Sequence, residues 1–233
     1  MKNQVIFTMG GKGGVGKTAF MVNLAEYFKY NQIPVILLDC DMENKMKGSF
    51  SHYFPEAQKV DIRQPDGLDI FIDSTQSEDN ATVLADLGAG SGFDLIQWFS
   101  EMYQSARSLD IIFTAVGTIT ANPGSLETVF GWANHLQHNV QYLITLNNFQ
   151  GEPKLWATSK SAEKFRNAFS PYEIFFKARI PEWQTELENY GYTLTQAMES
   201  DHPKFKKLSA RCRLELWRNQ IFEELEKCNA LWS

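Results

Sequence analysis

Cysteines are few in this 233-residue sequence, and long hydrophobic runs are absent. Cys40, Cys212 and Cys228 lie far apart and form no C-x-x-C pair or other metal-ligand spacing, so we expect no disulfide framework and no cysteine-bound metal. This cysteine usage is typical of the reducing cytoplasm. No run of about 18 apolar residues is present, so no membrane-spanning helix is predicted. The first apolar strand starts at residue 4, so we expect no secretory signal.

Positive charge is also scarce, and it is unevenly placed. The net charge is −6, with 9 Lys and Arg against 16 Asp and Glu in residues 1–150, but 13 against 12 in residues 151–233. One acidic residue lies within 204–218 beside six basic residues, which are Lys204, Lys206, Lys207, Arg211, Arg213 and Arg218. A local basic face of this kind binds phosphates, including those of DNA without sequence preference. A solvated helix face is the alternative interpretation.

The remaining composition is that of an ordinary soluble globular protein, with 43% hydrophobic and 21% charged residues. Short apolar runs rich in β-branched residues alternate with helical periodicity. The predicted strands are 4–9, 35–39, 81–86, 110–116, 140–146 and 174–180, and the predicted helices include 19–28, 122–138, 156–169 and 204–232. This alternation predicts a single α/β domain over 1–233, a three-layer sandwich around a mainly parallel sheet. Residues 204–232 are expected to form a closing helix packed on it.

A glycine-rich stretch at 10–18 joins the first predicted strand to the first predicted helix. From Gly11 to Thr18 it fits G-x-x-x-x-G-K-[ST], the phosphate-binding P-loop. Its backbone N–H groups and the start of the helix form an anion site, Lys17 adds a positive charge for the β- and γ-phosphates, and the Thr18 hydroxyl is placed to ligate Mg²⁺. The predicted nucleotide-binding residues of this stretch are Gly11, Lys12, Gly13, Gly14, Val15, Gly16, Lys17, Thr18 and Ala19.

Lys12 gives the loop a particular form. The sequence K-G-G-V-G-K-T at 12–18 resembles the deviant Walker A loop of the ParA/MinD family of ATPases. This resemblance implies a P-loop NTPase fold and an ATPase that forms a homodimer on binding ATP. It also implies that Lys12 crosses the dimer interface to contact the partner's ATP phosphates. The alternative is a solvated surface lysine beside an ordinary P-loop.

Three aspartates follow predicted strands at the carboxyl edge of the sheet, where open α/β sheets bind ligands. Asp39 and Asp41 form the D-x-D of 39–41, and Asp86 ends the strand 81–86 in the manner of a Walker B motif. The family resemblance assigns Asp41 to orienting or activating the attacking water, and it makes Thr18, Asp39, Asp41 and Asp86 the predicted Mg²⁺ ligands. Capping of the next helix by Asp39 and Asp41 is the alternative. No glutamate follows Asp86, so we expect slow hydrolysis.

The resemblance also suggests where the adenine is bound. Asn147 at the end of strand 140–146 matches the adenine-recognising asparagine of the family, with Asn148 as the second choice, although Asn-Asn is also ordinary loop chemistry. The pair Ile180-Pro181 matches the I-P pair whose following loop lines the adenine pocket. The nucleotide-sensing switch is expected within 42–80, where Met42-Glu43-Asn44 departs from the Pro-Gln common in the family.

Two functions remain open at this stage. The first is a weak Mg²⁺-dependent ATPase switch that positions or partitions DNA or another cargo, with a stimulating or cargo protein as partner, in the cytoplasm and possibly on the nucleoid. The second is a nucleotide-switched adaptor for conjugation, secretion or surface assembly that binds proteins and not DNA. A metabolic P-loop enzyme is third. Membrane targeting by 204–232 is disfavoured by the acidic residues Glu223, Glu224 and Glu226.

Overall fold

The computed structural model describes residues 3–43, 47–64, 66–77 and 81–232. Its centre is a seven-stranded sheet in the order β3-β2-β4-β1-β5-β6-β7, and every neighbouring pair of strands is parallel. The strands are β1 (Gln4–Thr8), β2 (Val35–Cys40), β3 (Gln58–Lys59), β4 (Thr82–Leu87), β5 (Ile112–Ile119), β6 (Gln141–Asn147) and β7 (Tyr172–Phe176). The inner strands carry continuous apolar runs because both faces of the sheet are covered by helices.

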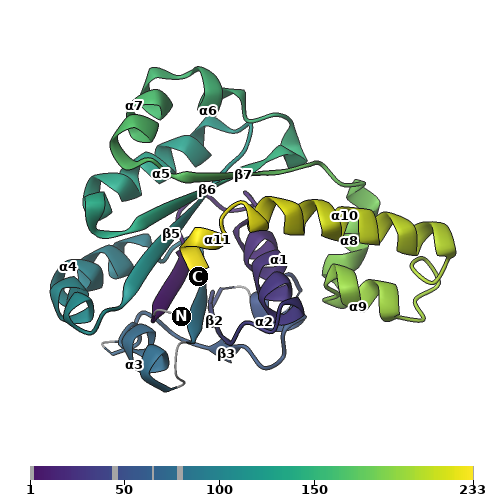
Figure 1. Cartoon of the computed structure of the whole chain (residues 1–233), viewed down its shortest axis with the longest axis horizontal. Helices are drawn as coiled ribbons and strands as arrows, with labels where there is room; N and C mark the ends of the chain where they lie inside the picture. The colour runs from purple at the N-terminus through teal and green to yellow at the C-terminus, as the bar shows by residue number, and fades with distance from the viewer. Residues whose placement is uncertain (1–2, 44–46, 65, 78–80, 233) are drawn as a thin grey trace.

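Alternate residues of each strand enter two separate cores. Val5 and Phe7 of β1 pack on one face of the sheet, while Ile6 packs on the other. The first face is covered by α3 (Ile70–Ser77), α4 (Gly92–Ser108), α5 (Pro123–Leu136), α6 (Lys154–Thr158) and α7 (Lys160–Phe169). The second is covered by α1 (Lys17–Tyr30), α2 (Phe50–Tyr53), α8 (Pro181–Tyr190), α9 (Leu194–Glu199), α10 (Leu208–Glu226) and α11 (Asn229–Trp232). The predicted three-layer α/β sandwich is confirmed (Figure 1).

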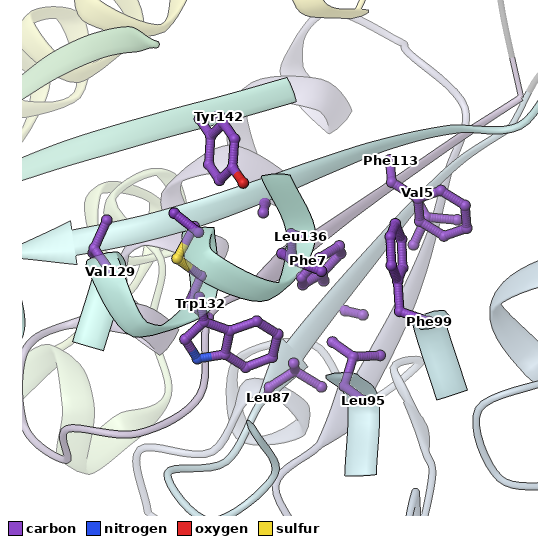
Figure 2. Packing of buried hydrophobic residues seen from close by; sticks show 14 of the residues in the cluster. Val5, Phe7, Leu87, Leu95, Phe99, Phe113, Val129, Trp132, Leu136 and Tyr142 are labelled. Carbon is purple, nitrogen blue, oxygen red and sulfur yellow. The ribbon is translucent and has the colours of Figure 1, made fainter. Parts of the chain in front are cut away.

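The first core connects directly to the glycine-rich loop. Figure 2 shows the rings of Phe7 and Trp132 side by side, and their centroids are 6.1 Å apart. Burial of each large apolar side chain stabilises the fold by roughly 1.5–3 kcal/mol. The Trp132 indole is 4% exposed, and its Nε1 donates a hydrogen bond of 2.9 Å to the carbonyl oxygen of Gly10. The same side chain therefore fills the core and fixes the start of the loop.

Several predicted boundaries are wrong. The predicted helix 156–169 is two helices, because Ser159 takes an extended conformation and its hydroxyl accepts a hydrogen bond from the Ala162 N–H at the start of α7. The predicted helix 204–232 begins only at Leu208 and breaks before α11. The strand predicted at 174–180 ends at Phe176, and Ile180-Pro181 instead begins α8. Helices α3, α4, α8 and α9 and strand β3 were not predicted.

The C-terminal helices α10 and α11 pack on the second face of the sheet. Helix α10 contacts α9, β7 and α1, and in α11 the Trp232 ring packs against the rings of Tyr27 and Phe28 of α1. Of the expected switch within 42–80, residues 44–46, 65 and 78–80 lie outside the described residues. No helix in the described part of the chain combines the length and apolar character that membrane crossing requires.

Candidate nucleotide-binding site

A cavity of about 350 Å³ opens at the carboxyl edge of the sheet, beside the loop between β1 and α1. This volume lies within the range of small-molecule sites. Six of the nine predicted loop residues line it, namely Gly13, Gly14, Gly16, Lys17, Thr18 and Ala19. Gly11, Lys12 and Val15 do not line it. The stretch forms the strand–loop–helix unit that a P-loop requires, with α1 starting at Lys17.

Gly16 holds the last turn of the loop in a conformation that favours glycine. Its φ is +99°, and a Cβ placed on it would lie 2.5 Å from Asn147 Nδ2. That same amide nitrogen donates a hydrogen bond of 2.9 Å to the Val15 carbonyl oxygen. The loop is therefore held from the end of β6, a strand far away in the sequence.

Lys17 is nearly buried at the base of the cavity, with 8% of its surface exposed. Its Nζ donates a hydrogen bond of 3.1 Å to the Lys12 carbonyl oxygen, which folds the side chain back along the loop. Burial lowers the pKa of the Lys17 ammonium group, and the negative charges of Asp86 and Asp41 oppose this shift. A buried cation flanked by two carboxylates is well placed to receive phosphate oxygens together with a divalent metal ion.

Asp86, near the end of β4, is a predicted Mg²⁺ ligand whose carboxyl group is buried. Its side chain is 1% exposed, and burial raises the pKa of the carboxyl to about 7, against the lowering effect of the neighbouring Thr18 hydroxyl. Oδ1 accepts a hydrogen bond of 3.3 Å from the Thr8 hydroxyl. Oδ2 is buried and has no hydrogen-bond partner among the described residues.

The donor groups fit a magnesium ion. An unpartnered buried carboxylate oxygen next to a threonine hydroxyl is a hard oxygen donor set of the kind Mg²⁺ prefers. In the described part of the chain no three His, Cys, Asp or Glu side chains converge on one metal position. Mg²⁺ bound with nucleotide needs no such set, because phosphate and water oxygens complete its coordination. The assignment of Thr18, Asp39, Asp41 and Asp86 as ligands stays a prediction.

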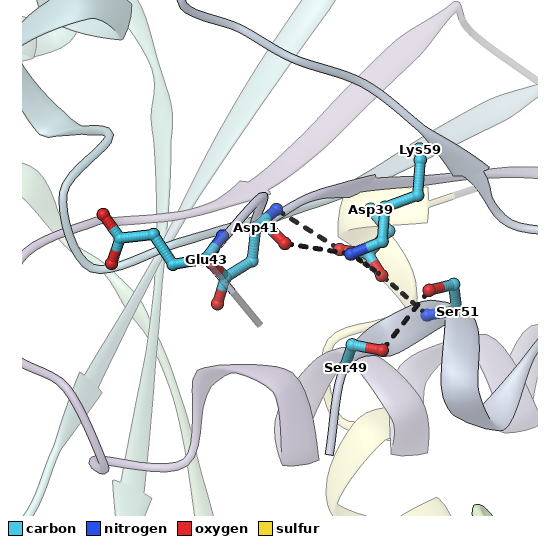
Figure 3. A network of polar contacts seen from close by, with 6 residues as sticks. All are labelled: Asp39, Asp41, Glu43, Ser49, Ser51 and Lys59. Carbon is cyan, nitrogen blue, oxygen red and sulfur yellow. Dashed lines mark hydrogen bonds and ion pairs between the residues drawn. The ribbon is translucent and has the colours of Figure 1, made fainter. Parts of the chain in front are cut away.

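The two aspartates of the D-x-D at the end of β2 have different surroundings (Figure 3). Asp41 lines the cavity, and its Oδ1 accepts a hydrogen bond of 3.1 Å from the Glu43 N–H. It lies close against Gly88, where a Cβ would approach that same oxygen to 2.7 Å. Asp39 is fully buried behind the turn and does not line the cavity. Its carboxylate is an acceptor for groups of its own chain.

Lys12 lies away from the cavity of its own chain. The residue is exposed, and its side chain extends beside the start of α5, where its Cδ would be 3.9 Å from a Cβ on Gly124. Its neighbour Gly13 lines the cavity, whereas Lys12 does not. The two lysines of the loop therefore have different directions, one inward and one outward.

The far end of the cavity is built from side chains that sequence reasoning did not find. They are contributed by α1, α2, β7, α8 and the β7–α8 connection, and they include Asn23, Tyr53, Phe176, Arg179, Gln184 and Glu188. Arg179 donates hydrogen bonds to Asn23 Oδ1 at 3.0 Å and to Gln184 Oε1 at 3.1 Å. Burial lowers the pKa of its guanidinium group to about 10, so it stays charged at neutral pH. No sequence pattern marked these residues.

Two of the predicted adenine residues do not line this end. Ile180 and Pro181 begin α8 and are absent from the cavity wall, although Arg179 immediately before them is part of it. Asn147 does line the cavity. Its Oδ1 accepts a hydrogen bond of 3.1 Å from the Phe149 N–H, so both polar atoms of its amide already contact the chain. Its contact with adenine stays a prediction.

Three of the six basic residues near α10 take part in contacts within the chain. Lys204 donates a hydrogen bond to the Glu182 carbonyl oxygen, Arg213 lies over the Trp183 ring, and Arg218 contacts the Thr195 hydroxyl. Lys206, Lys207, Arg211 and also Arg213 are exposed. The basic face predicted from the sequence is therefore narrower than its charge count indicates.

The fold and this loop together define a P-loop nucleotide-binding protein. Residues 6–190 match the sequence profile of the family described as the CobQ/CobB/MinD/ParA nucleotide binding domain. Because this match covers most of the chain, the chain belongs to that family, and the predicted relationship to ParA and MinD is confirmed. A comparison with curated protein sequences returned no match.

Solved structures are similar at low identity. They include a nucleotide-binding protein from Archaeoglobus fulgidus in complex with ADP (16% identity, 88% of this chain and 92% of that chain, TM-score 0.50). The signal recognition particle receptor FtsY from Elizabethkingia anophelis matches with 16% identity over 77% of this chain and TM-score 0.52, and this chain spans 60% of that one. The MinD cell division protein of Aquifex aeolicus has 15% identity, 95% and 98% coverage and TM-score 0.49. At such identities the first two likenesses show the fold alone.

Proposed function

We propose that this protein is an ATP-dependent dimerising switch that hydrolyses ATP slowly and positions or partitions DNA or another cargo. The observation that carries the proposal is the outward direction of Lys12. A lysine inside a phosphate-binding loop that does not line its own cavity is available to the nucleotide of a second copy. Membership of a family that includes MinD and ParA supports the same interpretation.

The proposed hydrolysis uses groups that lie around the cavity. Lys17 would bind the β- and γ-phosphates, and Asp41 would orient the water for in-line attack on the γ-phosphate. Thr18 and Asp86 would hold Mg²⁺, which neutralises charge on the phosphates when it is bound. No glutamate follows Asp86, so no strong general base adjoins it. Slow turnover is suited to a switch whose ATP state must persist long enough to act.

Molar mass by light scattering tests this proposal. The wild type is expected to be a dimer with ATP and a monomer with ADP. Lys12→Ala should stay monomeric with ATP while it still binds the nucleotide. Lys29→Ala is a matched control, because Lys29 lies at the far end of α1 in an exposed ion pair with Glu56. A wild type that stays monomeric with ATP bound contradicts the proposal and favours an ordinary P-loop enzyme.

The exposed face of α10 favours a second candidate function. Leu208 and Leu216 are 79% and 54% exposed, two turns apart on the helix that carries Arg211. Apolar side chains among basic ones suit a protein partner better than a phosphate backbone does. The alternative is therefore a nucleotide-switched adaptor that binds proteins and not DNA.

A DNA titration separates the two candidates. A positioning ATPase of the DNA-binding type is expected to bind duplex DNA only with ATP, with an affinity that falls steeply as salt rises. The variant Lys206→Ala/Lys207→Ala/Arg211→Ala should then lower both the affinity and the salt slope. If the ATP-bound dimer does not bind DNA at low salt, the adaptor is the better assignment.

A further inference from the structure

We infer that Lys59 and Asp39 act as a pair that positions Asp41, the residue proposed to orient the attacking water. This inference deepens the proposed function and rests on it for the role of Asp41. The contacts themselves are internal to the chain and lie at the carboxyl ends of β2 and β3 (Figure 3).

Asp39 connects three segments through one buried carboxylate. Its Oδ1 accepts a hydrogen bond of 3.2 Å from the Asp41 N–H, and its Oδ2 accepts one of 2.8 Å from the Ser51 N–H at the start of α2. The Lys59 ammonium group lies 3.0 Å from the same Oδ2. The side chain of Asp39 is completely buried, so its negative charge requires such partners. The Asp39 carboxylate thus accepts from the backbone N–H groups of Asp41 and Ser51 and pairs with Lys59.

Lys59 completes the arrangement from the edge strand. Its Nζ donates a hydrogen bond of 2.9 Å to the Asp41 carbonyl oxygen as well as contacting Asp39. The parallel pairing of β2 and β3 places Lys59 directly opposite Asp39. Asp41 is consequently held at both its N–H and its C=O, by the two members of one ion pair. These contacts fix the Asp41 backbone, and its side chain lines the cavity.

This arrangement assigns Asp39 a different role from the predicted one. A residue that coordinates Mg²⁺ directs its carboxylate at the metal site, whereas Asp39 does not line the cavity. Lys59 and Asp39 are positioning residues that act through Asp41. Loss of either is expected to misplace Asp41 without disturbing the loop that binds the phosphates. Misplacement of a reacting group by about 1 Å lowers the rate about 100-fold.

Hydrogen–deuterium exchange of the nucleotide-free protein gives a readout that does not depend on activity. In Lys59→Met, the peptide covering residues 38–43 should exchange about tenfold faster, because Asp39, the acceptor of the Asp41 N–H, loses the ion pair that holds its carboxylate. The P-loop peptide covering 10–18 should be unchanged. Lys59→Arg keeps a cation and should restore most of the protection. Lys29→Met removes a different, exposed ion pair, the one between Lys29 of α1 and Glu56, and it should leave the exchange of both peptides unchanged.

Steady-state kinetics gives the second readout. Lys59→Met and Asp39→Asn should both lower kcat about 10- to 100-fold with KM for ATP within about twofold of wild type. The Mg²⁺ concentration at half-maximal rate should not move. Asp39→Asn also serves if Lys59→Met does not fold.

Three results would overturn the inference. The first is unchanged exchange of 38–43 in both Lys59→Met and Asp39→Asn. The second is a raised Mg²⁺ requirement in Asp39→Asn, which would make Asp39 a metal ligand. The third is a wild-type kcat in both Lys59→Met and Asp39→Asn, although Asp41→Asn loses activity. If the wild type does not hydrolyse ATP, the proposed function fails, and the exchange experiment still decides whether the pair fixes the Asp41 turn.

Discussion

The two ends of the cavity are built in opposite ways. The phosphate end comes mainly from one stretch, residues 13–19 without Val15, in which glycines shape the backbone and Lys17 is the main positive charge; Asp41 is added from the end of β2. The far end is assembled from α1, α2, β7, α8 and the β7–α8 connection, and Arg179 joins Asn23 to Gln184 there. A site made by consecutive residues is visible in a sequence, whereas one made by segments over 150 residues apart is not.

The same contrast separates a backbone site from a side-chain site. At the phosphate end, function depends on N–H directions that few other residues permit. At the far end it depends on hydrogen bonds among side chains, which other residues replace at a moderate cost. Substitutions should therefore have large effects at the first end and graded effects at the second.

Lys17→Ala should have the largest effect. Removing a buried cation that faces Asp41 and Asp86 is expected to cost about 3–4 kcal/mol of ATP binding, roughly a 100- to 1000-fold loss of affinity. Calorimetric titration with ATP and Mg²⁺ measures this loss. Lys29→Ala is the control, with unchanged affinity expected. An affinity reduced less than tenfold would show that the loop does not bind the phosphates through this lysine.

Gly16→Ala against Gly13→Ala tests the backbone argument within a single loop. Gly16 has a positive φ, and its added Cβ would lie 2.5 Å from Asn147 Nδ2, so we expect a loss of about 2–3 kcal/mol in unfolding free energy. An added Cβ on Gly13 meets no atom within 4 Å, so we expect a change below about 1 kcal/mol. Urea unfolding without nucleotide measures both. Equal destabilisation would mean that the Asn147 contact does not constrain the loop.

Asn147→Ala distinguishes two roles for one side chain. As an anchor that donates to the Val15 carbonyl, Asn147 should contribute about 1–2 kcal/mol to stability, and its loss should weaken ATP and GTP by the same factor. As the adenine-recognising residue, its loss should weaken ATP alone. Binding of both nucleotides to Asn147→Ala and to Asn148→Ala decides between these roles.

The same distinction, between consecutive residues and distant segments, explains which features could be predicted from the sequence. The strand–loop–helix unit with Lys17 and Thr18, and the apolar strands that lead to Asp41 and Asp86, were predictable because local patterns dictate them. The break at Ser159 was missed, since an apolar period continues through it while a hydroxyl cap interrupts the helix. The direction of Asp39 was not predictable either, because its partner Lys59 belongs to a two-residue strand without a recognisable pattern.

Arg179→Met should have the smallest effect of the series. Arg179 lines the far end and links Asn23 to Gln184, so its loss should loosen that wall and weaken ATP by about three- to tenfold, or roughly 0.7–1.4 kcal/mol. The hydrolysis rate of bound ATP should stay near that of the wild type, because no reacting atom lies there. Arg166→Met is a matched control, since Arg166, like Arg179, donates a hydrogen bond to an oxygen acceptor within the chain, but it lies over the Trp156 ring on α7 and does not line the cavity. It should alter stability and leave ATP affinity unchanged. A loss of hydrolysis in Arg179→Met at saturating ATP would mean that the far end also places the phosphates, and the two ends of the cavity would then act as one unit.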